Sequence, residues 1–260
     1  MTPTWSGGEY GARARCVLAP NPGIMTLDGT NTWVLREPGA RRSVVVDPGP
    51  LDQTHLDAVA EHAGDVAVVL LTHGHLDHSE GARAFAEQAR CGVRALDPQH
   101  RLGDEGLGEG DVLEVDGLEI RVVGTPGHTA DSLSFLVPAD GAVLTGDTVL
   151  GRGTTVVAHP DGKLGAYLDS LQRLHALASA REATWVWPGH GPVIEDALAV
   201  LDHYLAHRQQ RLEQVREAMR QLGAEATARE VVEHVYTDVD PVLWGAAELS
   251  VRAQIDYLRG

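Results

Sequence analysis

The feature that most constrains this chain is a group of metal-binding side chains packed into one short segment. Residues 73–78 read HGHLDH and directly follow the apolar run 66–71. Imidazole and carboxylate groups are common protein ligands of zinc. Imidazoles this close together would repel one another on protonation if no metal separated them. We therefore predict a fold in which the end of a buried strand opens onto a metal site.

Further ligands of the same kind stand in similar contexts later in the chain. His128, Asp147 and His190 each follow a short strand-like run and are flanked by glycine or proline, which mark turns and loops. The 73–78 spacing differs from the i, i+4 histidine pair of a zinc-binding helix, and we expect an irregular loop. Such a loop can divide its ligands between two ions. The expected sets are His73, His75 and His128 on one ion, Asp77, His78 and His190 on the other, and Asp147 bridging.

Paired metals define the chemistry that we expect. Two ions about 3.5–4 Å apart hold a bridging hydroxide that is nucleophilic at neutral pH. Two divalent ions, two carboxylates and one hydroxide leave the site at roughly +1, so it could attract an anionic or carbonyl-bearing substrate. We expect Asp77 to be the catalytic residue that orients the nucleophile and handles its proton. Asp47, in the segment VDPG, is the expected outer acceptor that supports the histidine ligands.

Composition limits the cellular setting and the partners. The 260 residues carry a formal net charge of −16, which argues against broad adhesion to nucleic acids or anionic membranes. The two cysteines, Cys16 and Cys91, exclude a disulfide framework and suit a reducing compartment. No apolar stretch approaches the ~18 residues of a membrane span, and the start lacks a secretory pattern. We expect a cytoplasmic protein with no membrane partner.

The order of predicted elements indicates an α/β (α+β) protein with two sheets flanked by helices. Two similar halves, each with strands and helices, precede a C-terminal portion that is entirely helical. We therefore expect a catalytic domain over 1–204 and a small helical domain over 205–260. The predicted strands are 13–18, 31–36, 43–47, 66–71, 112–115, 119–123, 133–137, 142–144 and 184–187. The predicted helices are 51–63, 79–90, 164–177, 194–222, 227–235, a short one from 241 and 249–258, with a Thr227/Glu230 capping box.

Several conspicuous residues have ordinary structural interpretations. We expect the arginines of segment 205–222 to form a solvated helix face paired with Glu213 and Glu217. The segment 151–155 matches no phosphate-binding loop, and flexibility is its default interpretation. The other histidines are expected on the surface or satisfied in the core: His55, His62, His100, His159, His175, His203, His207 and His234.

Taken together, the ligand motifs resemble the metallo-β-lactamase superfamily over roughly residues 13–200. The resemblance implies an αββα sandwich with the metals at one edge of the two sheets. It also implies the ligand roles given above and a structural role for Asp47. The best-known secreted β-lactamases carry cysteine where Asp147 stands, so antibiotic hydrolysis is not expected. Diiron flavoproteins carry glutamate where His75 stands, and the β-CASP cap of RNA-processing nucleases is absent.

Segments 22–32, 151–155 and 244–248 look like those of the β-lactamase-like protein 2 group. That group ends in a small winged-helix-like domain and includes an endoribonuclease acting on single-stranded RNA, and similar sequences release polyketides as thioesterases. The tail has little room for a β-wing.

The leading hypothesis is a binuclear zinc-dependent hydrolase acting on single-stranded RNA, with manganese or iron as alternative metals. An alternative is a hydrolase of small-molecule acyl thioesters or esters of the glyoxalase II type. A persulfide dioxygenase with a single iron is a third hypothesis. A metal-dependent scaffold whose C-terminal helices pair with a partner is the fourth, and the long C-terminal helix is compatible with a homodimer.

Overall fold

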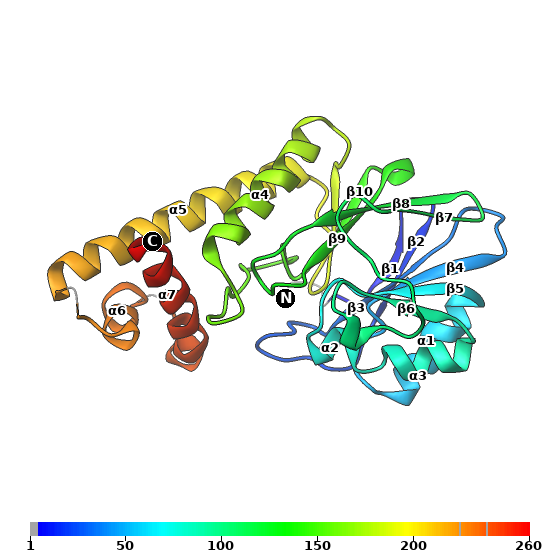
Figure 1. The fold of residues 1–260 in the computed structure, drawn as a ribbon, viewed down its shortest axis with the longest axis horizontal. Coiled ribbons are helices and arrows are strands. Elements are labelled where there is room, and N and C mark those ends of the chain that lie inside the picture. The colour runs from blue at the N-terminus through cyan, green and yellow to red at the C-terminus, as the bar shows by residue number, and fades with distance from the viewer. Residues whose placement is uncertain (1–4, 224, 238) are drawn as a thin grey trace.

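The computed structural model describes residues 5–223, 225–237 and 239–260. Two sheets face each other, and helices cover their outer faces (Figure 1). The first sheet has the order β1-β2-β3-β4-β5-β6, and the second has the order β11-β10-β9-β8-β7. This arrangement confirms the predicted αββα sandwich.

The strands of the first sheet come from the first hundred residues, and those of the second sheet follow. The first sheet contains β1 (Gly8–Tyr10), β2 (Ala14–Leu18), β3 (Asn31–Leu35), β4 (Arg42–Val46), β5 (Asp65–Leu70) and β6 (Gly92–Arg94). The second contains β7 (Val112–Val115), β8 (Leu118–Gly124), β9 (Leu133–Val137), β10 (Ala142–Gly146) and β11 (Trp185–Pro188). The sequence prediction missed β1 and β6, which have three residues each.

The main core lies between the two sheets because β3, β9 and β10 are buried along their whole length. Trp33 of β3 stacks on Trp187 of β11 across the sheets, with ring centroids 5.3 Å apart and an interplanar angle of 15°. Phe135 of β9 belongs to the same core and is fully buried. Burial of each such side chain contributes about 1.5–3 kcal/mol to the stability of the fold, so this apolar layer holds the two sheets together.

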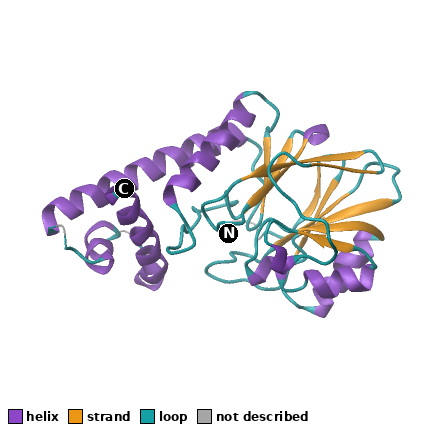
Figure 2. Cartoon of the chain, viewed as in Figure 1, coloured by secondary structure: helices purple, strands orange, loops and turns teal. Residues whose placement is uncertain are grey.

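Helices complete the outer layers (Figure 2). On the first sheet, α1 (Gln53–Ala63) and α3 (Ala82–Ala89) pack through an apolar cluster that includes Leu56 and Phe85. On the second sheet, α4 (Leu164–Ser179) and α5 (Ala197–Leu222) do the same through a cluster that includes Leu171 and Leu201.

The C-terminal portion is helical, as predicted. The 26-residue helix α5 extends beyond the sandwich, where α6 (Ala228–Val235) and α7 (Trp244–Arg259) fold back against it (Figure 1). The predicted Thr227/Glu230 capping box is present. No strand lies among the described residues beyond 204, so a wing is missing from that part of the chain. Helix α5 is continuous across residue 204, and the division into two domains stays a prediction.

Three local predictions were wrong. Residues 76–79 form a helical turn, α2 (Leu76–Ser79), where an irregular loop was expected, and α3 begins only after Gly81. A Cβ on Gly81 would lie 2.9 Å from the Pro50 oxygen, so a close approach to another loop separates the two helices. Helix α7 begins at Trp244, directly after the 3-10 turn Pro241–Leu243, and not at residue 249. Further 3-10 turns are Pro98–His100 and Pro138–Asp140.

Within the described residues, none of the helices combines the length and apolar character that crossing a bilayer requires.

The packing between the sheets gives a first prediction. Replacing Phe135 by Ala should lower the free energy of unfolding by about 3–5 kcal/mol, because the fully buried ring leaves a cavity. Urea unfolding monitored by circular dichroism measures the change. Val112→Ala, at a side chain 56% exposed on the edge strand β7, should cost far less. Equal losses in both variants would contradict this account of the core.

Candidate metal centre

Strand direction brings the predicted ligands to one edge of the sandwich. Strands β4 and β5 run parallel, so Asp47 and the 73–78 segment leave the first sheet at the same edge. Strands β10 and β11 also run parallel, which places Asp147 and His190 at neighbouring strand ends of the second sheet. His128 lies in the loop after β8.

The seven predicted ligands come together in two adjoining groups, each with its ligand atoms within 4.8 Å of one another. In the first group, Nδ1 of His75 lies 3.1 Å from Nε2 of His73 and 3.1 Å from Nε2 of His128. In the second, Nε2 of His190 lies 3.2 Å from Nε2 of His78 and 3.1 Å from Oδ2 of Asp77. These groups have the membership predicted from the sequence.

Asp147 stands between the two groups and offers one carboxylate oxygen to each. Its Oδ2 lies 3.6 Å from Nε2 of His128, in the first group. Its Oδ1 lies 3.4 Å from Nε2 of both His78 and His190, in the second group. The bridging role that the sequence predicted for Asp147 stays a prediction.

Hydrogen bonds to the outer ring nitrogens of the histidines determine which nitrogens face the centre. Asp47 Oδ2 accepts a 2.6 Å hydrogen bond from Thr72 Oγ1, which leaves this hydroxyl to accept from Nδ1 of His73 at 3.0 Å. The same carboxylate oxygen accepts from Nδ1 of His78 at 2.8 Å. Nδ1 is therefore protonated in both rings, and each Nε2 lone pair points toward the other ligands.

The other two loop histidines are oriented by backbone carbonyl groups. Nδ1 of His128 donates to the Val156 oxygen at 2.8 Å, and Nδ1 of His190 donates to the Gly29 oxygen at 3.1 Å. Their Nε2 atoms therefore face the other ligand atoms of the centre. Outer hydrogen bonds of this kind are usual for metal-binding histidines.

The donor set fits a divalent metal. Ligand atoms about 2.0–2.1 Å from a tetrahedral ion are roughly 3.3 Å apart, close to the 3.1 and 3.2 Å separations between these ring nitrogens. Oδ1 of Asp147 is buried and has no hydrogen-bond partner among the described residues. Converging ring nitrogens and a buried carboxylate oxygen without a hydrogen-bond partner are costly unless a proton or a metal ion binds them. The cluster therefore supports a divalent metal cofactor.

Asp47 occupies the supporting position that the sequence predicted. It is buried, and besides the two contacts of Oδ2 its Oδ1 accepts from the Thr72 backbone N at 2.8 Å. Its backbone has a φ of 50°, in the left-handed region, where aspartate is tolerated better than most residues. One carboxylate, placed at the end of β4, thus orients side chains of both groups.

In the absence of metal, burial and the neighbouring charges shift the pKa values of the residues in the cluster. Burial alone would raise the pKa of Asp77, but the hydrogen bond with His190 and the charge of His78 lower it to about 2. Burial opposes protonation of His190, but Asp147 outweighs it and raises the pKa to about 9. Burial, His78 and His128 hold the pKa of His73 well below its ordinary value, even though Asp147 opposes them. The second group therefore retains a proton at neutral pH until a metal displaces it.

Some supporting residues were not found from the sequence. Asn31 is fully buried, and its Nδ2 donates 2.9 Å hydrogen bonds to the Pro188 and Gly191 oxygens on either side of His190. Thr72 connects Asp47 to His73, because its hydroxyl donates to the Asp47 carboxylate and accepts from the His73 ring. Asn31 lies in the 22–32 segment that carried the family resemblance, but no spacing rule indicates its contact with a loop about 160 residues away.

Two ordinary interpretations were wrong. Segment 151–155 is tied to its surroundings, since Thr155 Oγ1 donates to the Asp147 oxygen and Arg208 Nη2 donates to the Thr155 oxygen. Arg208 is only 8% exposed and lies over the Tyr167 ring, so it does not belong to a solvated face. Arg211 likewise lies over the Tyr236 ring.

The outer part of that helix face was predicted correctly, since Arg216 pairs with Glu213 and Arg220 pairs with Glu217. His55 is a satisfied core residue, with Nε2 2.9 Å from Thr32 Oγ1.

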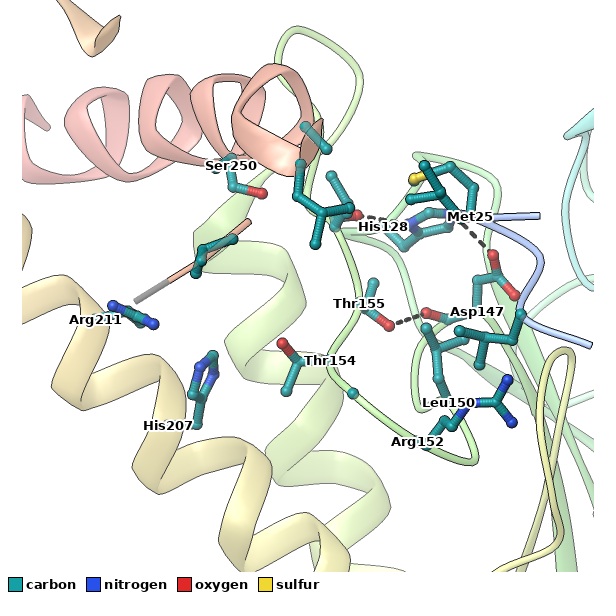
Figure 3. Close-up of a pocket in the computed structure, with 18 of the residues that line it drawn as sticks. Met25, His128, Asp147, Leu150, Arg152, Thr154, Thr155, His207, Arg211 and Ser250 are labelled. Atoms are coloured by element: carbon teal, nitrogen blue, oxygen red, sulfur yellow. Dashed lines mark hydrogen bonds and ion pairs between the residues drawn. The ribbon is translucent and has the colours of Figure 1, made fainter. Parts of the chain in front are cut away.

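A cavity of about 340 Å³ opens beside the centre, and His128 and Asp147 line it (Figure 3). Ile24 and Met25 of the N-terminal loop form one wall, and α5 with the start of α7 forms the opposite wall. The volume lies in the range of small-molecule sites. Much of the lining is apolar.

Comparisons with known proteins agree with this geometry. Residues 25–190 match the family model described as the metallo-beta-lactamase superfamily. The chain is 35% identical to "Atrochrysone carboxyl ACP thioesterase" of Aspergillus fumigatus, over 85% of this chain and 72% of that protein. It is 32% identical to "Beta-lactamase-like protein 2 homolog" of Caenorhabditis elegans, over 85% of this chain and 76% of that protein.

Solved structures share the fold. A beta-lactamase domain protein from Burkholderia ambifaria superposes with a TM-score of 0.81 at 24% identity, covering 97% of this chain and 87% of that chain. A metallo-beta-lactamase family protein from Thermus thermophilus gives a TM-score of 0.77 at 24% identity, covering 95% of this chain and 93% of that chain.

The role of Asp47 can be tested through metal affinity. Asp47→Asn should weaken metal binding by about 10- to 100-fold, because the His78 ring loses the carboxylate that accepts from it and Thr72, which accepts from His73, loses its own acceptor. Competition with a fluorescent chelator measures the affinity. Asp57→Asn, on the exposed face of α1, is the matched control and should leave it unchanged. Unchanged affinity in the Asp47 variant would contradict the supporting role.

Metal binding should also depend on pH. The pKa of His190 is raised to about 9, above the unfolded value of about 6.5, so this ring stays protonated at pH 7 in the metal-free protein. Binding must release that proton. Affinity should therefore rise from pH 7 to about pH 9 and then level off. Titration calorimetry in buffers of different ionisation enthalpy measures the protons released, and release of none at pH 7 would be contrary to this prediction.

Proposed function

Since the chain belongs to the metallo-β-lactamase superfamily and is a metal-dependent hydrolase, we propose that it hydrolyses acyl thioesters at a centre of two zinc ions. The observation that carries the proposal is the largely apolar cavity that ends on His128 and Asp147. Such a cavity suits an acyl chain whose carbonyl group reaches the metal ligands. Similarity to a protein named as a thioesterase supports the same chemistry.

The proposed ligand sets follow the geometry of the two groups. His73, His75 and His128 would hold the first ion, and Asp77, His78 and His190 would hold the second. Asp147 would contribute Oδ2 to the first ion and Oδ1 to the second. When bound, such ions lower the pKa of water toward about 7 and polarise a carbonyl oxygen.

Asp77 is suited to handle the proton of the attacking water. Its side chain is 29% exposed, compared with 12% for Asp147, so it is the more accessible carboxylate. With a pKa of about 2 it is ionised at neutral pH. Contacts of Oδ2 with His190 at 3.1 Å and with Thr30 Oγ1 at 3.4 Å hold it at the centre.

Cleavage of single-stranded RNA is a second candidate. It is favoured by the 22–32 segment and by the similarity to β-lactamase-like protein 2 homologs. A net charge of −16 disfavours it, because a phosphate backbone binds mainly through neutralisation by basic side chains. The same protein preparation should be assayed on single-stranded RNA and on acyl thioesters. RNA cleavage without thioester hydrolysis would overturn the proposed substrate class.

Metal analysis tests the proposed centre. We expect two zinc ions per chain, because the seven donors form two groups with a shared carboxylate. Mass spectrometry of the purified protein measures the ratio, and removal by a chelator should abolish thioester hydrolysis. One iron per chain would favour the dioxygenase hypothesis.

Replacement of Asp77 tests the mechanism. Asp77→Asn should lower kcat by about 10²- to 10⁴-fold, the usual contribution of acid–base catalysis, while the unfolding temperature changes little. Release of free thiol measures the rate. Glu87→Gln, at an exposed position on α3, is the control. Full activity of the Asp77 variant would remove this residue from the mechanism, and full biological function without it would favour the scaffold hypothesis.

A further inference from the structure

The cavity beside the metal centre has two chemically different ends. His128 and Asp147 line one end, and three neighbouring basic residues of α5, His207, Arg208 and Arg211, line the other. In Figure 3, His207 and Arg211 project from α5 on the side of the cavity away from Asp147, with Thr154 between them and the centre. A concentration of basic groups is unusual in a chain with a net charge of −16.

Arg208 is a buried cation without an acidic partner. It is 8% exposed, and no carboxylate in the described part of the chain lies within ion-pair distance of it. Its Nη2 donates to the Thr155 oxygen, and its guanidinium lies 4.9 Å from the Tyr167 ring centroid. Its Nε is buried and has no hydrogen-bond partner among the described residues. Buried charges are normally paired, so this arginine is incomplete in the protein alone.

His207 next to it is also unsatisfied. Its Nδ1 is buried without a hydrogen-bond partner in the described ranges. Burial and the charges of Arg208 and Arg211 lower the pKa of His207 to about 4, so the ring is neutral at pH 7. A neutral imidazole can donate one hydrogen bond to an anion.

Among the residues that the structure describes, no carboxylate pairs with His207 or Arg208. Asp147 is the one carboxylate that lines the described cavity, and it belongs to the opposite, metal-binding end. The lining also includes apolar side chains, among them Met25, Leu150 and Leu243. A ligand that fits this lining has a reacting carbonyl, an apolar part and an anionic end.

We propose that His207 and Arg208 form a binding site for an anionic group, a carboxylate or a phosphate, carried by the substrate at the end remote from its reacting carbonyl. The identification of the substrate as a thioester rests on the proposed function, whereas the anion site rests on the unsatisfied groups of α5. The phosphate could belong to the carrier of the thiol, and the carboxylate could belong to the acyl chain.

Binding of thioether analogues tests the site without any hydrolysis. The probes are S-alkyl derivatives of N-acetylcysteamine that end in a methyl group or in a carboxylate, and S-alkyl 4′-phosphopantetheine that ends in a methyl group. Calorimetry on the metal-loaded protein should show at least one anionic probe binding about 10- to 100-fold more tightly than the neutral one, the range for charge-assisted hydrogen bonds. If the carboxylate-ended probe binds more tightly, the anion belongs to the acyl chain. If the phosphopantetheine probe binds more tightly, the anion belongs to the carrier of the thiol. Equal affinity for all three probes would overturn the proposal.

Variants distinguish the α5 site from direct binding to the metals. Arg208→Met retains the aliphatic volume and should remove the preference for the anionic probe. Arg220→Met, at an arginine whose side chain is 63% exposed on the same helix, should retain it. Arg208 also donates a hydrogen bond to the Thr155 oxygen, so its replacement could disturb the loop. A second pair of variants, at Thr154, therefore leaves Arg208 unchanged. Thr154→Glu supplies a carboxylate at this end of the cavity and should abolish the preference, while Thr154→Gln should keep it. A preference that survives Thr154→Glu would assign the anion to the metals and overturn the proposal.

Hydrolysis of the matching thioesters separates this inference from the proposed function. Tighter binding of an anionic probe, together with faster turnover of the corresponding thioester, supports both. Tighter binding that follows the variants, without turnover of any thioester, supports the anion site and rejects the thioesterase function. Equal hydrolysis of neutral and anionic thioesters, with equal binding of the probes, supports the thioesterase function and rejects the anion site.

Discussion

The structure around the centre depends on the convergence of histidine ring nitrogens, which a metal ion stabilises and which, without metal, share the proton that His190 holds at neutral pH. Nδ1 of His73 and His78 is committed to the network of Asp47 and Thr72, so the Nε2 atoms must face inward. The network makes the geometry largely independent of the metal, because the acceptors are buried residues at the ends of β4 and β5. One buried carboxylate, that of Asp47, therefore orients side chains in both groups of the centre.

The sequence pointed to the residues that cluster at this edge because each one follows a strand and is surrounded by turn-forming residues. Parallel pairing of β4 with β5 and of β10 with β11 brings such positions to one edge, so local patterns were enough to identify the cluster. Long central strands were equally recognisable from their apolar runs. The short strands β1 and β6 carry too few residues for a pattern, and their pairing comes from tertiary contacts.

The roles of the basic residues on α5 could not be predicted in this way. The repeating Arg and Glu residues of 205–222 fit a solvated helix, and they form one where Arg220 pairs with Glu217. Nearer the sandwich, the 151–155 segment covers the same helix and buries Arg208. Which arginines are solvated thus depends on a loop more than 50 residues earlier in the chain, and helical periodicity contains no information about it.

Helix α5 also connects the helical C-terminal portion to the loop that follows Asp147. Helix α5 packs on the second sheet through Leu201 and Tyr204 and continues to the helices α6 and α7. The Tyr204 hydroxyl accepts from the Leu150 backbone N at 2.9 Å and donates to the Gly153 oxygen at 3.2 Å. The loop that follows Asp147 is therefore held by the same helix that supplies the basic end of the cavity. Because one helix contacts both, it fixes the position of the distant wall of the cavity relative to the backbone that follows Asp147.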